Sequence, residues 1–92
     1  MAKTNPEVDG LLNLWDLLHF CTLQPMTTAE LITTLGVTEA STRRLRKRAA
    51  DRYQVDLNQV EVEREGRKVP AFSLDDWNWR EPLSARFEAL GA

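Results

Sequence analysis

Five cationic side chains fall within six consecutive positions in the middle of the chain, at Arg43, Arg44, Arg46, Lys47 and Arg48. Groups of this kind suit phosphates, because each combines a positive charge with several N–H donors. Arginine can also read guanine in the DNA major groove through two parallel hydrogen bonds. A cationic run on a helix is otherwise usually a solvated face. The surrounding elements must therefore decide between these two interpretations.

The overall charge alone argues against a nucleic-acid binder. The 92 residues carry a formal net charge of −2, from 12 Lys and Arg against 14 Asp and Glu. Without the five central cations the rest of the chain is strongly acidic. Ionic screening limits the influence of an exposed charge to roughly 8–10 Å, so a local basic patch can still meet phosphates. The acidic remainder is expected to weaken non-specific binding.

Other chemistry is poorly supported by the residues present. The chain has no Ser/His/Asp set, no phosphate-binding glycine loop and no metal-ligand spacing, so we expect no enzyme activity, no cofactor and no metal site. His19 and Cys21 are each the single residue of their type and are interpreted as structural. A single cysteine forms no internal disulfide, which favours the cytoplasm. No apolar run reaches the roughly 18 residues of a membrane span.

The first predicted helix covers residues 7–23, after a start at residues 1–6 that we expect to be frayed. Leu11, Trp15, Leu18 and Thr22 recur at helical spacing on one face, and further apolar residues flank them. A helix this apolar needs cover on more than one side. A second subunit or the C-terminal segment could supply it, and the sequence leaves both open.

Two further helices follow the break at Gln24 and Pro25. Thr27 and Glu30 have the spacing of a capping box, which predicts the start of the second helix at this point. Gly36 ends that helix, and Val37 follows as an expected buried anchor. Thr38 caps a third helix that runs to about Tyr53. Its expected inward face consists of Thr38, Ser41 or Thr42, Leu45, Ala49, and Tyr53 or Arg52.

Alternating residues after the third helix predict a β-hairpin, with strands near 58–64 and 68–74 and Gly66 at the turn. Pro70 predicts an edge position or a bulge in the second strand. Met26 is expected to contact this sheet as a one-residue strand. A short helix is predicted over 83–90. The fold class is therefore mainly α with a small β-hairpin (α+β), in one domain over 1–92 with a core of about 7–74 and an extension over 75–92.

The segment from Glu30 to Arg44 resembles the bacterial winged helix-turn-helix regulators. A short helix ends in Leu35-Gly36-Val37-Thr38, and an Arg-Arg pair follows a few residues later. The nearest groups are the N-terminal domains of DeoR-type and WYL-type transcriptional regulators, and the resemblance covers roughly residues 10–74. The family usually has a small residue in place of Ile32 and an apolar residue in place of Thr42. The resemblance implies a three-helix core plus wing that binds DNA.

A helix-turn-helix places its second helix in a major groove about 12 Å wide. We expect the helix 38–53 in that groove, with base edges approached by Thr38, Glu39, Ala40, Arg43, Arg44 and Lys47. Arg46 and Arg48 lie further round the helix and are expected to meet phosphates. Thr28, at the start of the second helix, can hold a phosphate beside free backbone N–H groups. In the hairpin 64–68, Arg67 and Lys68 are the expected contacts of the wing.

The function expected from these features is sequence-specific binding of double-stranded DNA by a transcriptional regulator, a repressor in its simplest form. It is expected to be prokaryotic or viral, cytoplasmic, and associated with the nucleoid when bound. A homodimer through the helix 7–23, the C-terminal aromatic segment or both would double the base contacts. Two alternatives are a winged-helix adaptor that binds proteins through its acidic body, and the DNA-binding part of a larger regulator.

Overall fold

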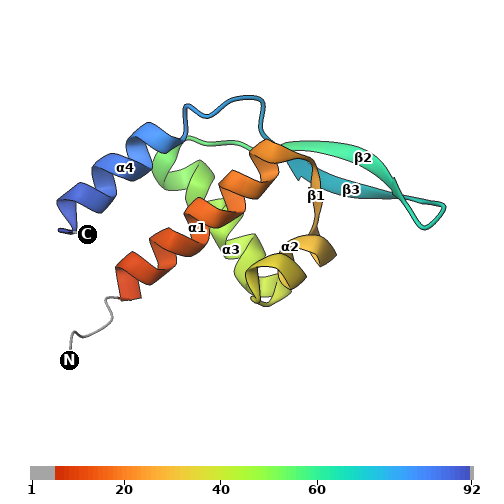
Figure 1. Ribbon diagram of the computed structural model, residues 1–92, viewed down its shortest axis with the longest axis horizontal. Coiled ribbons are helices and arrows are strands. Elements are labelled where there is room, and N and C mark those ends of the chain that lie inside the picture. Colours follow the sequence, from red (N-terminus) through yellow and green to blue (C-terminus); the bar gives the residue numbers. More distant parts are fainter. Residues whose placement is uncertain (1–5, 92) are drawn as a thin grey trace.

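The computed structural model describes residues 6–91, in which helices occupy one end and a β-hairpin projects from the other (Figure 1). This part of the chain contains four helices and a three-stranded antiparallel sheet, and it measures 48 × 28 × 20 Å. The expected small α+β fold class is confirmed. In chain order the elements are α1 (Pro6–Leu23), β1 (Met26–Thr27), α2 (Thr28–Leu35), α3 (Glu39–Tyr53), β2 (Asn58–Arg64), β3 (Arg67–Ser73) and α4 (Arg80–Ala89).

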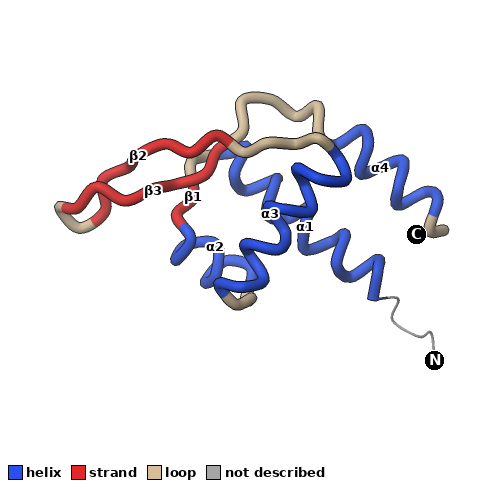
Figure 2. Tube along the Cα trace, turned by 180° about the vertical axis from the view of Figure 1, so that it is seen from behind, coloured by secondary structure: helices blue, strands red, loops and turns tan. Residues whose placement is uncertain are grey.

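The sheet has the strand order β1-β3-β2, with both pairings antiparallel (Figure 2). Met26 pairs with Phe72 and Thr27 with Ala71, so the predicted contact of Met26 with a later sheet is confirmed and is one residue longer than expected. Pro70 lies outside the pairing of β1 with β3. Among the described residues, β3 pairs with β2 alone at this position. The missing N–H of Pro70 is tolerated there, because that side of β3 is locally an edge.

The hairpin closes with a two-residue turn at Glu65 and Gly66, both of which have positive φ, 55° and 74° respectively. This pattern is that of the type I′ turn, which suits the right-handed twist of a hairpin. Glycine adopts it freely, whereas a residue with a Cβ atom is strained. Glu65 is therefore the strained position of the turn.

Replacing Glu65 by asparagine is expected to stabilise the hairpin by up to about 1 kcal/mol, because asparagine tolerates the left-handed region far better than glutamate. Hydrogen exchange at the β2 and β3 amides would measure the gain. The matched control is Glu63→Asn, which removes the same charge from an exposed strand position. Equal protection in the two variants would contradict the strain argument.

The core forms where α1 meets the other helices and the sheet. Leu14, Leu17 and Leu18 of α1 are completely buried, as are Leu31 of α2 and Leu83 of α4. This pattern explains how such an apolar first helix is accommodated, since α2, α3, α4 and β3 all pack on it. At about 25 cal/mol per Å² of apolar surface, burial of these leucines dominates the stability of the fold.

The C-terminal segment supplies part of the cover for α1. Trp79 is 3% exposed, and its ring lies edge-on to Trp15 at 5.0 Å between ring centroids. Its indole N–H donates to the Thr22 hydroxyl at 2.9 Å, so the polar atom of this large side chain is satisfied inside the core. Through Trp79 and the buried Leu83, the C-terminal segment thus joins the core. Of the two kinds of cover that the sequence left open for α1, the chain itself provides this one.

Two helices begin earlier in the chain than the sequence predicts. Helix α4 begins at Arg80 and not at residue 83, so Pro82 falls inside its first turn. Proline is tolerated there because first-turn N–H groups have no partner within the helix. Helix α1 begins at Pro6, a residue that the sequence prediction includes in the frayed start. Proline fits the first helical position, which explains the earlier start. The rest of that expected frayed start, residues 1–5, lies outside the described residues.

Candidate nucleic-acid interface

The turn between α2 and α3 is held by local caps at each helix end. The Thr27 hydroxyl accepts from the Glu30 N–H at 3.1 Å, and the Thr27 N–H donates to Glu30 Oε1 at 2.9 Å, which confirms the predicted capping box. Gly36 ends α2 in the left-handed conformation (φ 67°), and its N–H donates to the Ile32 carbonyl. The Thr38 hydroxyl then accepts from the Ser41 N–H at the start of α3. The left-handed Gly36 and the Thr38 side-chain cap therefore set the direction in which α3 leaves the turn.

The inner face of α3 consists of Thr42, Leu45 and Ala49, all of them buried. The Thr42 hydroxyl donates to the Glu39 carbonyl at 2.7 Å, which explains how threonine occupies a position where an apolar residue would be usual. Thr38 was expected on this inner face but is exposed, because its hydroxyl caps the helix from outside. Val37, expected to be buried, is only half-buried.

Opposite this inner face lie Arg43, Arg44 and Lys47, which we call the α3 outer cations; all three are exposed. Arg43 approaches Glu39 at 3.7 Å, with both side chains 66% exposed, and such surface pairs are worth at most about 1 kcal/mol. Arg44 donates to the Ser41 hydroxyl at 3.2 Å. Neither contact buries a charge, so the α3 outer cations can meet an external partner. Ala40, beside them, is exposed and adds no bulk.

The other two cations of the central run turn to the flanks of α3. Arg48 lies over α1, since a Cβ atom at Gly10 would stand only 2.9 Å from its Nη1. Arg46 lies over the sheet, with its guanidinium carbon 4.0 Å from the centroid of the Phe72 ring. Burial lowers the pKa of Arg46, and the charge of Arg43 adds to that effect. The five cations therefore occupy three different environments.

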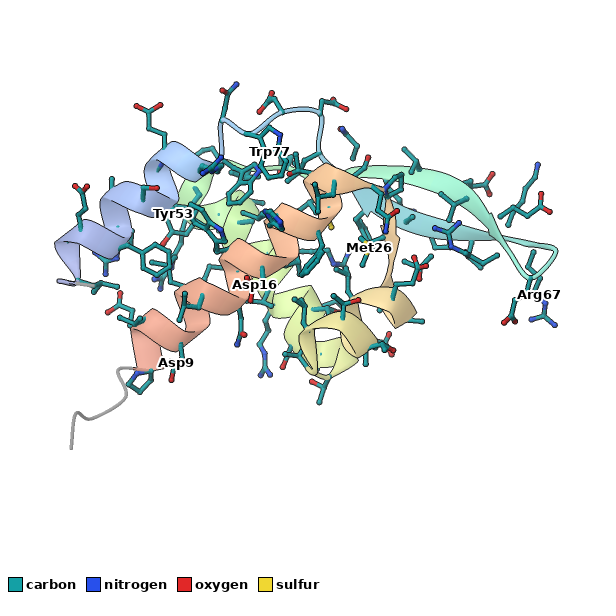
Figure 3. The ribbon with its side chains drawn as sticks, viewed as in Figure 1. Asp9, Asp16, Met26, Tyr53, Arg67 and Trp77 are labelled. Carbon is teal, nitrogen blue, oxygen red and sulfur yellow. The ribbon has the colours of Figure 1, made fainter. Side chains whose placement is uncertain are left out.

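Arg67 and Lys68 are exposed on the hairpin, and Figure 3 shows Arg67 at its far end, away from the helices. Arg64 behaves differently. Its Nε donates to Glu30 Oε2 at 3.0 Å and so ties the hairpin to the start of α2, 34 residues earlier in the chain. Glu30 thus accepts the capping-box hydrogen bond with Oε1 and the hydrogen bond from the hairpin with Oε2. Sequence reasoning missed this contact, for which no local pattern exists.

Thr28, the remaining predicted contact, is the first residue of α2 and is half-buried. The capping box occupies the N–H groups of Thr27 and Glu30 and leaves those of Thr28 and Ala29 outside it. The structure therefore places Thr28 at the start of α2, Thr38 and Glu39 at the start of α3, and the α3 outer cations along the same helix. Arg67 and Lys68 stand apart on the hairpin.

No family model, curated protein or solved structure matches this chain. The function must therefore be inferred from the geometry of the site. Within residues 6–91, no helix has the length and hydropathy needed to cross a bilayer. In the same range, no group of three or more His, Cys, Asp or Glu side chains is placed to hold a metal ion.

The ion pair between Glu30 and Arg64 is expected to make the position of the hairpin depend on pH. The Thr27 N–H and then the Arg64 side chain hold the pKa of Glu30 below the ordinary value of 4.5. A lowered carboxyl pKa stabilises the fold above the unfolded-state pKa, and this contribution is lost as the pH falls through the folded-state pKa. Because the pair is partly exposed, its contribution is at most about 1 kcal/mol. Replacing Glu30 by glutamine keeps a capping-box acceptor and removes the charge.

The Glu30→Gln variant should therefore lose hydrogen-exchange protection in the hairpin at pH 7 while α2 keeps its own. The difference between variant and wild type should disappear as the pH falls through the lowered folded-state pKa of Glu30. A matched control is Glu63→Gln, on the same hairpin. If Glu30→Gln leaves hairpin protection unchanged at pH 7, the ion pair does not position the hairpin.

Proposed function

We propose that this chain is a winged-helix domain that binds double-stranded DNA sequence-specifically, with α3 in the major groove and the β2–β3 hairpin as the wing. The element order α1-β1-α2-α3-β2-β3 and the strand order β1-β3-β2 support this fold. The observation that carries the proposal is the set of α3 outer cations, Arg43, Arg44 and Lys47, exposed on a helix whose direction the Gly36 turn sets.

The N-terminal half of α3 is the part best suited to DNA. Arg43 and Arg44 can each form a bidentate contact with guanine, and the Ala40 methyl can touch a thymine methyl. One turn beyond Lys47, the exposed Asp51 occupies the same side of the helix and would repel phosphates. The contact therefore ends near Lys47. The wing cations Arg67 and Lys68 would reach the minor groove or the adjacent backbone.

A homodimer completes the proposal, because one small module rarely buries enough surface for tight specific binding. The surface of α1 that α4 leaves open includes Leu12, 48% exposed, beside the half-buried rings of Trp15 and Phe87. Trp77, 39% exposed, is the accessible ring of the C-terminal aromatic segment. We propose a cytoplasmic repressor that occludes a promoter as this dimer, or the DNA-binding part of a larger regulator.

The competing function is a protein-binding adaptor, favoured by the exposed carboxylates of Glu61, Glu63 and Glu65 on the hairpin. A fluorescence-anisotropy titration of the wild-type chain with a random duplex at two or more salt concentrations separates the two. DNA binding predicts a log–log salt slope of about −0.9 per phosphate contact. Selection from a random pool then reports the preferred sequence. Absence of duplex binding at low salt would reject the DNA-binding proposal and favour the adaptor.

A further inference from the structure

A groove of about 380 Å³ separates α3 from the root of the hairpin. Arg43, Arg46 and Lys47 line it from the helix. Phe72 and Gln59 line it from the sheet, where they are direct cross-strand partners and so lie on the same face. Three cations thus line one groove from adjacent turns of a single helix.

Arg46 is the most constrained of these cations. Its guanidinium stacks on Phe72, which is itself 9% exposed and held in β3 between β1 and β2. Contact with a ring face restricts the motion of a guanidinium, while its two Nη groups remain possible donors to an anion. The side chain therefore loses less conformational freedom when it binds an anion than a freely rotating surface arginine would.

The same side chain has a hydrogen-bond donor without an acceptor. Arg46 Nε is buried and has no hydrogen-bond acceptor among the described residues, and no ion pair of Arg46 is found in that part of the chain. Burial and the charge of the neighbouring Arg43 both lower the pKa of Arg46, because each disfavours the charged form. A partly buried cation in this state gains from any anion that reaches the groove.

We propose that this groove is a binding site for a phosphate group, with Arg46 as its anchor and Lys47 as the second cation from α3. The source of the phosphate rests on the proposed function: it is a backbone phosphate of the bound DNA strand that passes between α3 and the wing. Asp56 also lines the groove, and its carboxylate would repel the anion, so the phosphate is expected nearest the cations of α3.

Arginine Nε–H resonances in a ¹H–¹⁵N spectrum of the intact chain test the site directly. The Arg46 signal is expected to shift on addition of a short duplex, and more weakly with inorganic phosphate alone. A shift with phosphate but not with duplex would establish the anion site and overturn DNA as its source. Shifts of Arg43 and Arg44 with duplex, without one of Arg46, would overturn the site while DNA binding stands. No shift with either ligand would overturn both proposals.

Substitution gives a second measurement. Arg46→Gln is expected to weaken duplex binding about tenfold and to reduce the magnitude of the log–log salt slope by about one, as for one lost phosphate contact. Arg46→Lys should restore the slope but only part of the affinity, because lysine cannot stack or bind in a bidentate manner. Arg52→Gln, at the exposed end of the same helix, is the matched control. An unchanged slope in a folded Arg46→Gln variant would overturn the proposal.

Discussion

The double substitution Arg43→Ala/Arg44→Ala is expected to lower duplex affinity by about thirtyfold or more. Each bidentate arginine–guanine contact is worth about 1–3 kcal/mol, and the two side chains are exposed neighbours on the outer face of α3. Should either one contact phosphate instead, the log–log salt slope would become shallower by about one for each lost contact. Anisotropy titrations at several salt concentrations measure affinity and slope together. The fold should persist, because neither side chain contributes to the core.

A control with the same change in net charge separates local contact from general attraction. Arg52→Ala/Arg86→Ala removes two exposed cations, one from the last turn of α3 and the other from the last turn of α4. Because screening confines exposed charges to roughly 8–10 Å, this variant should bind DNA within about threefold of wild type. If both double variants lose the same affinity, binding depends on overall charge, and α3 is not the reading element.

Much of the candidate site could be predicted because its determinants are local. The capping box of Thr27 and Glu30, the left-handed Gly36 and the cap at Thr38 each act within a few residues, and their patterns are visible in the sequence. Helical periodicity likewise separates the inner face of α3 at Thr42 and Leu45 from the outer cations. The elements and the outward presentation of the cations follow from such short-range signals.

The contacts that distinguish the cations from one another are not local, and the sequence does not contain them in readable form. Arg46 stacks on Phe72, and Arg64 turns back to Glu30, across separations of 26 and 34 residues. Both depend on how the hairpin packs beside α2 and α3, which periodicity does not specify. The start of α4 is also not readable from local patterns. Trp79 and Leu83 pack on the core, and the helix between them begins at Arg80, ahead of Pro82.

Replacing Leu83 by alanine is expected to destabilise the fold by about 2–5 kcal/mol, because this side chain of α4 is completely buried in the core. A loss of this size is a large fraction of the 5–15 kcal/mol that holds a typical domain together. Urea denaturation followed by circular dichroism would show a lower midpoint. The change tests whether α4 belongs to the same cooperative unit as the helix-turn-helix.

The matched control is Leu23→Ala, which makes the same chemical change at a side chain that is 59% exposed and should cost less than about 1 kcal/mol. If both variants lose equally little stability, α4 packs only loosely on the core. The apolar surface of α1 would then need to be covered by another subunit. If Leu83→Ala alone is unstable, the chain covers this side of α1 itself. A homodimer would then have to use the surface around Leu12, and the unfolding midpoint of the wild type would rise with protein concentration.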